Sequence, residues 1–259
     1  MDLKLQPVFT DEMLSFLYSS TVFQSLNEEE QQLFIKKYES NHHFHEILSV
    51  AQIIQEVIVE VEQSIPPISE EVREFFSKPN KSILDCVRIE DNILHVPFDQ
   101  LRKENGPLIV CLQQGDDMKE VEQFCKGMIL PLLDLCHRQH RDLMILPFAE
   151  QASLIQLKCG KITFEQFDTF IHMHLEGVSK LNAVYHVLSE CISSLQTTEQ
   201  VEVIIVSNNH FCDYNENIME QFDLFFKAQN IAISAIAMSE ETFNRQPLSF
   251  IDKVFFANE

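Results

Sequence analysis

The sequence predicts an α/β fold in which a doubly wound, mostly parallel sheet of six strands follows an N-terminal helical region. From residue 106 onward, short apolar runs alternate with longer segments of helical periodicity, a pattern typical of a parallel sheet with helices on both faces. Before residue 80 the periodicity is helical alone. With 45% hydrophobic and 23% charged residues, the chain has the composition of a globular protein with a sizeable core.

Residues 1–80 are expected to form the helical region. Cap residues followed by acidic side chains mark helix starts, and prolines mark helix ends. The expected helices begin at Thr10, Asn27, about His45 and Ser69, and the last two end before Pro66 and at Pro79.

Residues 81–105 are expected to hold a β-hairpin and a linker. Two apolar segments, 83–89 and 93–98, flank the polar stretch 90–92, which favours two paired extended segments. The polar residues 99–105 then lead into the second domain, predicted over 106–259.

The second domain begins with the apolar run 108–112, which ends in a small polar turn. The link between the second and third strands is only 149–151, too short for a crossover helix, so the third strand should be antiparallel. Pro131 predicts a kink in the first helix, because it removes one helical hydrogen bond. The expected strands are 108–112, 143–148, 154–157, 201–206, 231–237 and 254–256, and the expected helices run over about 121–136, from 163, over 180–195 and over 218–227.

Composition excludes several classes of function. The formal net charge of −21 would repel nucleic acid and anionic membranes and fits a basic protein partner. Five glycines in the whole chain leave no Gly-rich nucleotide loop. The N-terminus lacks the pattern of a signal peptide, and no apolar run approaches the roughly 20 residues that span a bilayer. Seven cysteines without a C-x-x-C pair indicate reduced, buried thiols in a cytoplasmic protein.

The second domain resembles a von Willebrand factor A (vWA) domain, a Rossmann-like fold. The resemblance covers about residues 106–257 and rests on the order of elements, the antiparallel third strand and the phrases at 106–111 and 141–148. Within that family the chain is most similar to bacterial intracellular vWA proteins with an N-terminal helical region. The resemblance implies a protein-interaction function with a MoxR-type AAA+ ATPase as the partner.

The family's functional feature is a metal-ion-dependent adhesion site, in which D-x-S-x-S after the first strand, a later Thr and an Asp after the fourth strand hold Mg²⁺. This sequence departs from that pattern. Gln113 stands for the first Asp, Gly115 for the first Ser and Asp117 for the second. Ser179 stands for the Thr, and Asn208 for the last Asp. Because two neutral amides replace two carboxylates, we expect a degenerate site that needs no metal or other cofactor.

The preferred hypothesis is therefore a non-enzymatic adaptor. Its contact surface would be the edge of the sheet formed by residues 113–118, 177–182 and 207–214, called the rim below. One alternative is a metal-dependent adaptor in which Asp116 and Asp117, with Ser179 and Asn208, rebuild a Mg²⁺ site. Paired acids at a helix start more often complement the helix dipole.

A second alternative is a cysteine-dependent enzyme. Cys212 is the thiol at a strand-end loop, and His210 precedes it by two residues. Such an enzyme needs an activated, exposed thiol next to a base, and no orienting partner is recognisable. The histidines at 42, 43 and 45, at 137 and 140, and at 172 and 174 lack metal-ligand spacing and favour ordinary helix ends. Phe98, Phe148 and Phe211, near strand ends, are further candidates for a partner surface.

Overall fold

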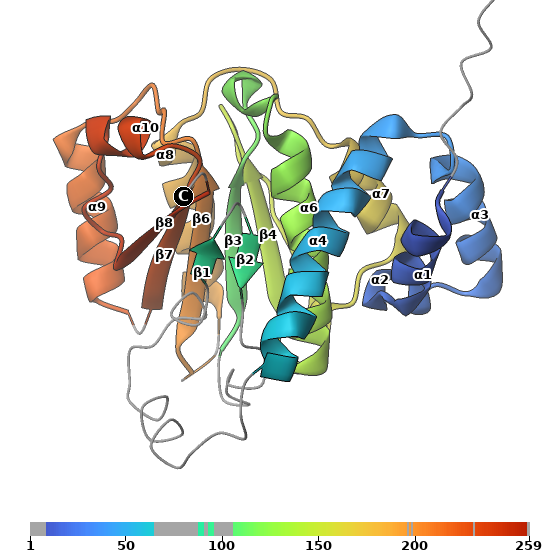
Figure 1. Cartoon of the computed structure of the whole chain (residues 1–259). Helices are drawn as coiled ribbons and strands as arrows, with labels where there is room; N and C mark the ends of the chain where they lie inside the picture. Colours follow the sequence, from blue (N-terminus) through green and yellow to red (C-terminus); the bar gives the residue numbers. More distant parts are fainter. Residues whose placement is uncertain are drawn as a thin grey trace, which may run out of the picture.

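The computed structural model describes residues 9–64, 88–90, 93–95, 106–195, 197, 199–229 and 231–257, with the backbone alone at 56–64, 88–90 and 93–95. Its centre is a six-stranded sheet in the order β5-β4-β3-β6-β7-β8 (Figure 1). The strands are β3 (Leu108–Gln113), β4 (Leu143–Phe148), β5 (Ile155–Leu157), β6 (Val201–Ser207), β7 (Ile231–Ala237) and β8 (Lys253–Phe256).

The sheet is parallel except at one edge. β3 pairs in parallel with both β4 and β6, so it is a central strand. β5 pairs antiparallel with β4, as Ile145 opposite Ile155 shows. All six predicted strands and the antiparallel third one are therefore confirmed.

Helices cover both faces of the sheet. Leu108, Val110 and Leu112 of β3 belong to the core that includes α6 (Glu122–Arg138) and α7 (Phe164–His172). Ile109 and Cys111 point to the other face, into the core with α8 (Leu181–Ser194) and α9 (Glu216–Lys227). This alternation follows from the two-residue period of a strand.

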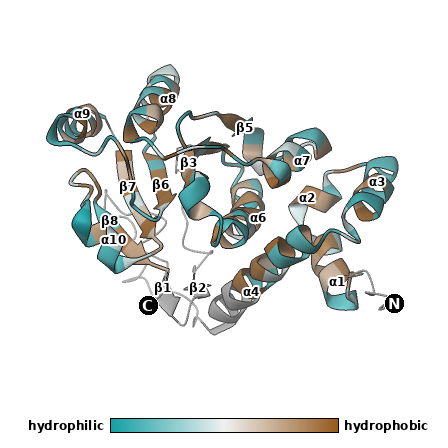
Figure 2. Cartoon of the chain, turned by 90° about the horizontal axis from the view of Figure 1, so that it is seen from above, coloured by the Kyte–Doolittle hydropathy of each residue, from teal (hydrophilic) through white to brown (hydrophobic). Residues whose placement is uncertain are grey.

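The N-terminal helices lie outside α6 and α7 on the same side of the sheet (Figure 2). They are α1 (Asp11–Ser19), α2 (Thr21–Gln24), α3 (Glu28–Tyr38) and α4 (His42–Ser64). Their apolar residues share one core cluster with that face of the sheet, including Phe34, Phe44 and Phe167 of α7. The helical region thus has no separate core, and the boundaries of the predicted domains stay a prediction.

Specific contacts join the two regions. Asp134 of α6 accepts a hydrogen bond from the Thr21 backbone N–H at 2.7 Å, and Tyr38 donates to Asp168 of α7 at 2.5 Å. α4 crosses α6 at Gly127, where a Cβ would lie 2.7 Å from Val50 Cβ.

Several predictions need correction. The third predicted helix is α4, which begins at His42 and not near His45. The Asn41 side chain accepts a hydrogen bond from the Phe44 N–H at 3.0 Å and so caps the helix at this earlier residue. The hairpin is present as β1 (Arg88–Glu90) and β2 (Ile93–His95), which pair antiparallel, so Glu90 belongs to a strand and not to the turn. A short helix, α10 (Glu240–Arg245), was not predicted. The predicted fourth helix and the linker 99–105 lie outside the described residues.

The cysteines fit the expectation in part. Among the described residues every cysteine is free, and Cys111, Cys125, Cys136 and Cys191 are buried. Cys159 is half-buried and Cys212 is exposed, contrary to the prediction of buried thiols. None of the helices in the described ranges has the length and apolar character to cross a membrane.

Candidate functional site

The carboxyl ends of β3 and β6 bring the predicted rim residues together. Gln113 is the last residue of β3 and is buried. Gly115 and Asp117 follow in a turn that includes the short helix η3 (Asp116–Met118). Ser179 lies in the loop before α8 and is buried, and Asn208 directly follows β6. This edge of the sheet is the expected place for a ligand in an open α/β fold.

The carboxylate of Asp117 lies at the centre of these residues. Its Oδ2 accepts hydrogen bonds from Gln113 Nε2 at 3.0 Å and from Asn208 Nδ2 at 3.2 Å. Its Oδ1 accepts from Ser179 Oγ at 3.5 Å. His210 Nδ1 lies 3.8 Å from Oδ2 on the exposed side. The resemblance predicts a cation among carboxylates here, whereas this chain places a carboxylate among N–H and O–H donors.

The orientation of both amides is fixed by the backbone. Gln113 Oε1 accepts the Asn208 backbone N–H at 3.0 Å, so its nitrogen must face Asp117. Asn208 Oδ1 accepts the His210 backbone N–H at 3.0 Å, so its Nδ2 also faces Asp117. Since a backbone N–H can only donate, rotating either amide would lose a hydrogen bond.

Gly115 leaves the space that Asp117 uses. A Cβ at this position would lie 2.7 Å from Ser179 Oγ and 2.8 Å from Asp117 Oδ1. The missing hydroxyl at residue 115 and the longer side chain at residue 117 are therefore two parts of one packing arrangement.

Asp116 has partners of its own. Its Oδ2 accepts the Gly177 N–H at 3.0 Å, its backbone N–H donates to Gly177 O at 3.1 Å, and Oδ1 pairs with Lys119 at 2.7 Å. The Lys119 ammonium, and then the Gly177 N–H, hold the pKa of Asp116 below its ordinary value. The two neighbouring acids therefore bind different groups.

The loops of the rim are joined by side-chain contacts that the sequence did not predict. Asp213 accepts the backbone N–H groups of Leu181 and Asn182 at 2.8 and 2.9 Å, so it caps α8 from a distant loop. Gln246 accepts the Phe211 N–H at 2.9 Å. Lys180 pairs with Glu150 at 2.6 Å, which raises the pKa of Lys180.

The two residues of the cysteine alternative contact different groups. Cys212 is exposed and its backbone N–H donates to Ser179 O at 3.1 Å. The His210 ring lies beside Asp117, and the described contacts include none between this ring and the Cys212 thiol. Phe148 and Phe211 are buried and stack with their ring centroids 6.3 Å apart, so they pack the interior and offer no partner surface. Phe98 lies outside the described residues.

The other histidines serve helix ends and local pairs. His172 Nδ1 lies 2.9 Å from the Asp168 carbonyl oxygen, and His137 Nδ1 lies 3.2 Å from that of Cys159. Within the described ranges there is no group of three or more His, Cys, Asp or Glu side chains placed to hold a metal ion.

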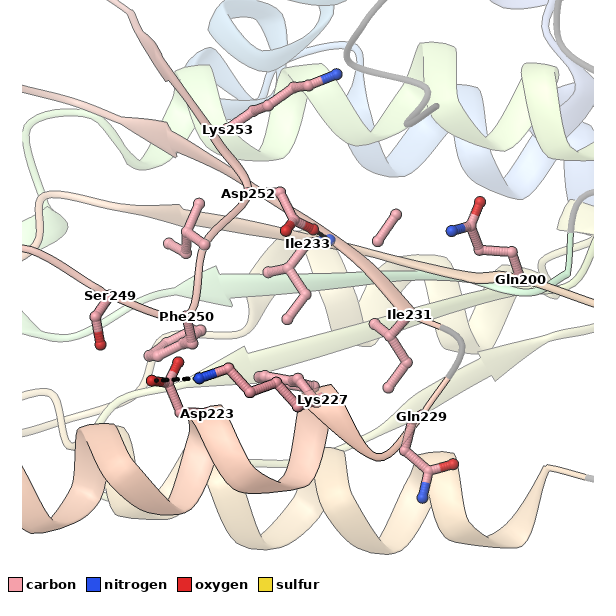
Figure 3. A pocket seen from close by; sticks show the side chains of 13 residues that line it. Gln200, Asp223, Lys227, Gln229, Ile231, Ile233, Ser249, Phe250, Asp252 and Lys253 are labelled. Atoms are coloured by element: carbon pink, nitrogen blue, oxygen red, sulfur yellow. Dashed lines mark hydrogen bonds and ion pairs between the residues drawn. The ribbon is translucent and has the colours of Figure 1, made fainter. Parts of the chain in front are cut away.

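A cavity of about 420 Å³ lies at the opposite end of the sheet (Figure 3). Phe226, Phe250 and Ile233 line it, and the ion pair between Asp223 and Lys227 borders it at 3.2 Å. None of the predicted rim residues contributes to its lining.

No family model matches the sequence, and neither does any curated protein. Among solved structures, the chain is similar to BatB from Bacteroides thetaiotaomicron, with 9% identity over 51% of this chain and 66% of that one at a TM-score of 0.39. It is also similar to the SpRpn10 VWA domain, with 9% identity over 59% and 87% of the two chains at 0.43. A von Willebrand factor type A structure from Catenulispora acidiphila has 6% identity over 63% and 39% at 0.43.

The matched region is less than two thirds of the BatB chain and of the C. acidiphila chain. Likeness at this level of identity concerns the fold alone. The described chain is thus a six-stranded, mostly parallel α/β fold with N-terminal helices, and vWA domains are among the solved structures similar to it.

Proposed function

We propose that this chain is a non-enzymatic protein-interaction module of vWA-like fold, in which an internal network around Asp117 replaces the metal site. The observation that carries the proposal is the direction of the Gln113 and Asn208 amides. Both present N–H groups to the point where the family holds a cation.

Such a centre is unsuited to a hard divalent cation. Mg²⁺ requires anionic or neutral oxygen ligands at short distance, and here it would meet two amide nitrogens with their hydrogens. Turning both amides around would forfeit the hydrogen bonds from the Asn208 and His210 backbones. The Asn208 N–H is partly buried, and leaving it without a partner would cost about 1–3 kcal/mol. The His210 N–H is exposed and can bind water, so its loss would cost less.

The proposed docking surface is the rim. Val178 is 54% exposed there, beside the network formed by Ser179 and Asp117. Single exposed apolar side chains are common on protein surfaces, so Val178 serves here as the position at which a substitution tests the rim. We propose a protein partner in the cytoplasm and, following the family resemblance, an AAA+ ATPase of the MoxR type.

The geometry favours neither alternative. A rebuilt Mg²⁺ site would need Asp116 and Asp117 to converge, but Asp116 pairs with Lys119 and Gly177 while Asp117 pairs with the two amides. A cysteine enzyme would need a base at Cys212, and His210 lies beside Asp117.

Thermal unfolding with metal ions tests the proposal. The wild type should unfold at the same temperature in EDTA and in millimolar Mg²⁺, Mn²⁺ or Ca²⁺. An ion that does not bind the native state cannot stabilise it. The positive control restores the family pattern by Gln113→Asp, Gly115→Ser, Asp117→Ser, Ser179→Thr and Asn208→Asp. That variant should gain a Mg²⁺-dependent rise in midpoint.

If an ion stabilises the wild type and Asp117→Ala abolishes the effect, the internal network is not a substitute for metal and the proposal fails.

Binding of a purified MoxR-type ATPase tests the docking surface directly. Val178→Glu should abolish its binding, whereas Leu224→Glu, at a side chain 65% exposed on α9, should leave it unchanged. Equal effects of the two variants would reject the rim as the docking surface.

A further inference from the structure

Lys126 is a charged residue inside the apolar stripe of α6. Only 1% of its side chain is exposed. Its ammonium group donates to Ile171 O and Met173 O, each at 2.8 Å, and pairs with Glu122 one turn earlier in the same helix. Three N–H bonds therefore have three acceptors, which is the condition for burying a lysine.

Two of these acceptors mark the end of α7. Ile171 lies in its last turn, and Met173 is the first residue after it. Carbonyl groups at a helix C-terminus lack partners within the helix, and a cation complements the dipole there. Lys126 thus caps α7 from a neighbouring helix.

The chain leaves this point directly into the rim. Residues 173–180, called the α7–α8 loop below, carry Gly177, Val178 and Ser179. The loop is held at Gly177 by Asp116 and at its end by the bond from the Lys180 N–H to Ala149 O at 3.0 Å. Gly177 has φ +90°, a conformation that favours glycine. Because glycine also leaves the backbone free to adopt other conformations, contacts on both sides of it are needed to hold the loop in one shape.

We propose that Lys126 is a positioning residue for the rim: its buried ammonium, held by Glu122, fixes the start of the α7–α8 loop and so the placement of Val178 and Ser179. Lys126 itself is buried, so it acts on the docking surface only through the loop. The inference rests on the proposed function in taking the rim as the docking surface, but the loop anchoring can be measured without a partner.

Amide hydrogen exchange on the full chain is the test. Lys126→Met keeps the length and removes the three donors, so protection of the Gly177 and Lys180 amides should fall by about tenfold or more beyond any change at Val110 and Ile205 in the central strands. Val203→Ala, at a fully buried residue of β6, is the control for general destabilisation and should lower protection in the strands without selecting the loop.

Glu122→Gln provides a second variant in case Lys126→Met fails to fold. It weakens the pair while keeping the shape of α6, and it should loosen the same two amides by a smaller factor. The inference would be overturned if amide protection fell uniformly over the protein. It would also be overturned if the variant that folds showed no fall in protection in the α7–α8 loop. Selective loosening without loss of ATPase binding would instead place the failure with the proposed docking surface.

Discussion

Gln113 and Asn208 each use one amide oxygen to accept a backbone N–H and one amide nitrogen to bind Asp117. Each side chain therefore links the end of β6 to the turn after β3. Asp117 is therefore the one carboxylate that both amides share, whereas Asp116 and Asp213 bind backbone N–H groups of the rim.

Removing that acceptor should destabilise the protein. In Asp117→Ala, Gln113 Nε2 and Asn208 Nδ2 lose the carboxylate and keep only the backbone oxygens of His210 at 3.5 Å and of residue 117 at 3.1 Å. We expect the free energy of unfolding to fall by about 1–3 kcal/mol, because hydrogen bonds to a charged group are lost. Asp116→Ala should cost less, because the Asp116 side chain is about half exposed at 52%. Urea unfolding of both variants measures the difference, and equal losses would contradict the central role of Asp117.

Tyr38 is a second residue whose state depends on its surroundings. Its hydroxyl is buried against Asp168, which also pairs with Lys37. Burial, and then the hydrogen bond to Asp168, raise the pKa of Tyr38 well above its ordinary value. Because the pKa is higher in the folded than in the unfolded protein, this stabilisation is present below about pH 10 and is lost as the pH rises toward the folded value.

Alkaline titration followed by phenolate absorbance should show this. The chain has four tyrosines, and one of them should ionise only together with unfolding. Tyr38→Phe should remove that late step and leave the others. A smooth titration of all four tyrosines in the folded wild type would contradict the assignment.

At the scale of elements, a buried ion pair joins the amino ends of neighbouring strands in the sheet. Arg141, before β4, pairs with Glu202 of β6 at 2.7 Å, and both side chains are 2% exposed. Arg141 also donates to Gly106 O and, at 3.4 Å, to Pro107 O, just before β3. One side chain thus joins three neighbouring strands opposite the rim.

Breaking this pair on one side should be costly. Glu202→Leu leaves the Arg141 charge buried without its carboxylate, and we expect a loss of about 3–5 kcal/mol in the free energy of unfolding. The double variant Arg141→Met with Glu202→Leu should recover part of the loss, since it buries no unpaired charge. Additive losses in the double-mutant cycle would show that the two side chains do not act as a pair.

The elements with strong periodicity were predictable from the sequence, and the local exceptions were not. The strands β3, β4, β6 and β7 follow from apolar runs that are buried on both faces over almost their whole length. The edge strands β5 and β8 are shorter apolar segments that are only partly buried. α10 escaped prediction because it has six residues and buries none of them. At the rim, the family resemblance indicated which residues would meet, such as Gln113 and Asn208. Capping by Asp213 and anchoring by Lys126 depend on contacts between distant segments, which no local pattern records.

At the scale of the whole molecule, the N-terminal helices and the sheet share one core. Tyr38, Phe34, Phe44 and Phe167 form an aromatic cluster across the boundary, with ring centroids 4.4–6.2 Å apart. We therefore expect the described helices and the sheet to unfold together in one transition.

Gly127→Ala tests how tightly these regions are joined. In an exposed helix this change would stabilise by about 1 kcal/mol. Here the new Cβ would lie 2.8 Å from Ile47 O and 2.7 Å from Val50 Cβ, so we expect destabilisation of about 1–3 kcal/mol. Calorimetry and far-ultraviolet circular dichroism give both the sign and the number of transitions. If Gly127→Ala were more stable than the wild type, α4 would have to move away from α6 to make room for the new Cβ.

The shared core also makes the two sides of the sheet unequal in what they offer to other molecules. A protein approaching from the α8–α9 side meets the helices that pack directly on the strands. From the α6–α7 side it meets α1–α4 first (Figure 1). The N-terminal helices thereby cover α6 on one side of the sheet, and α6 and α7 join these helices to the sheet through one shared core. α7 then leads along the chain into the rim.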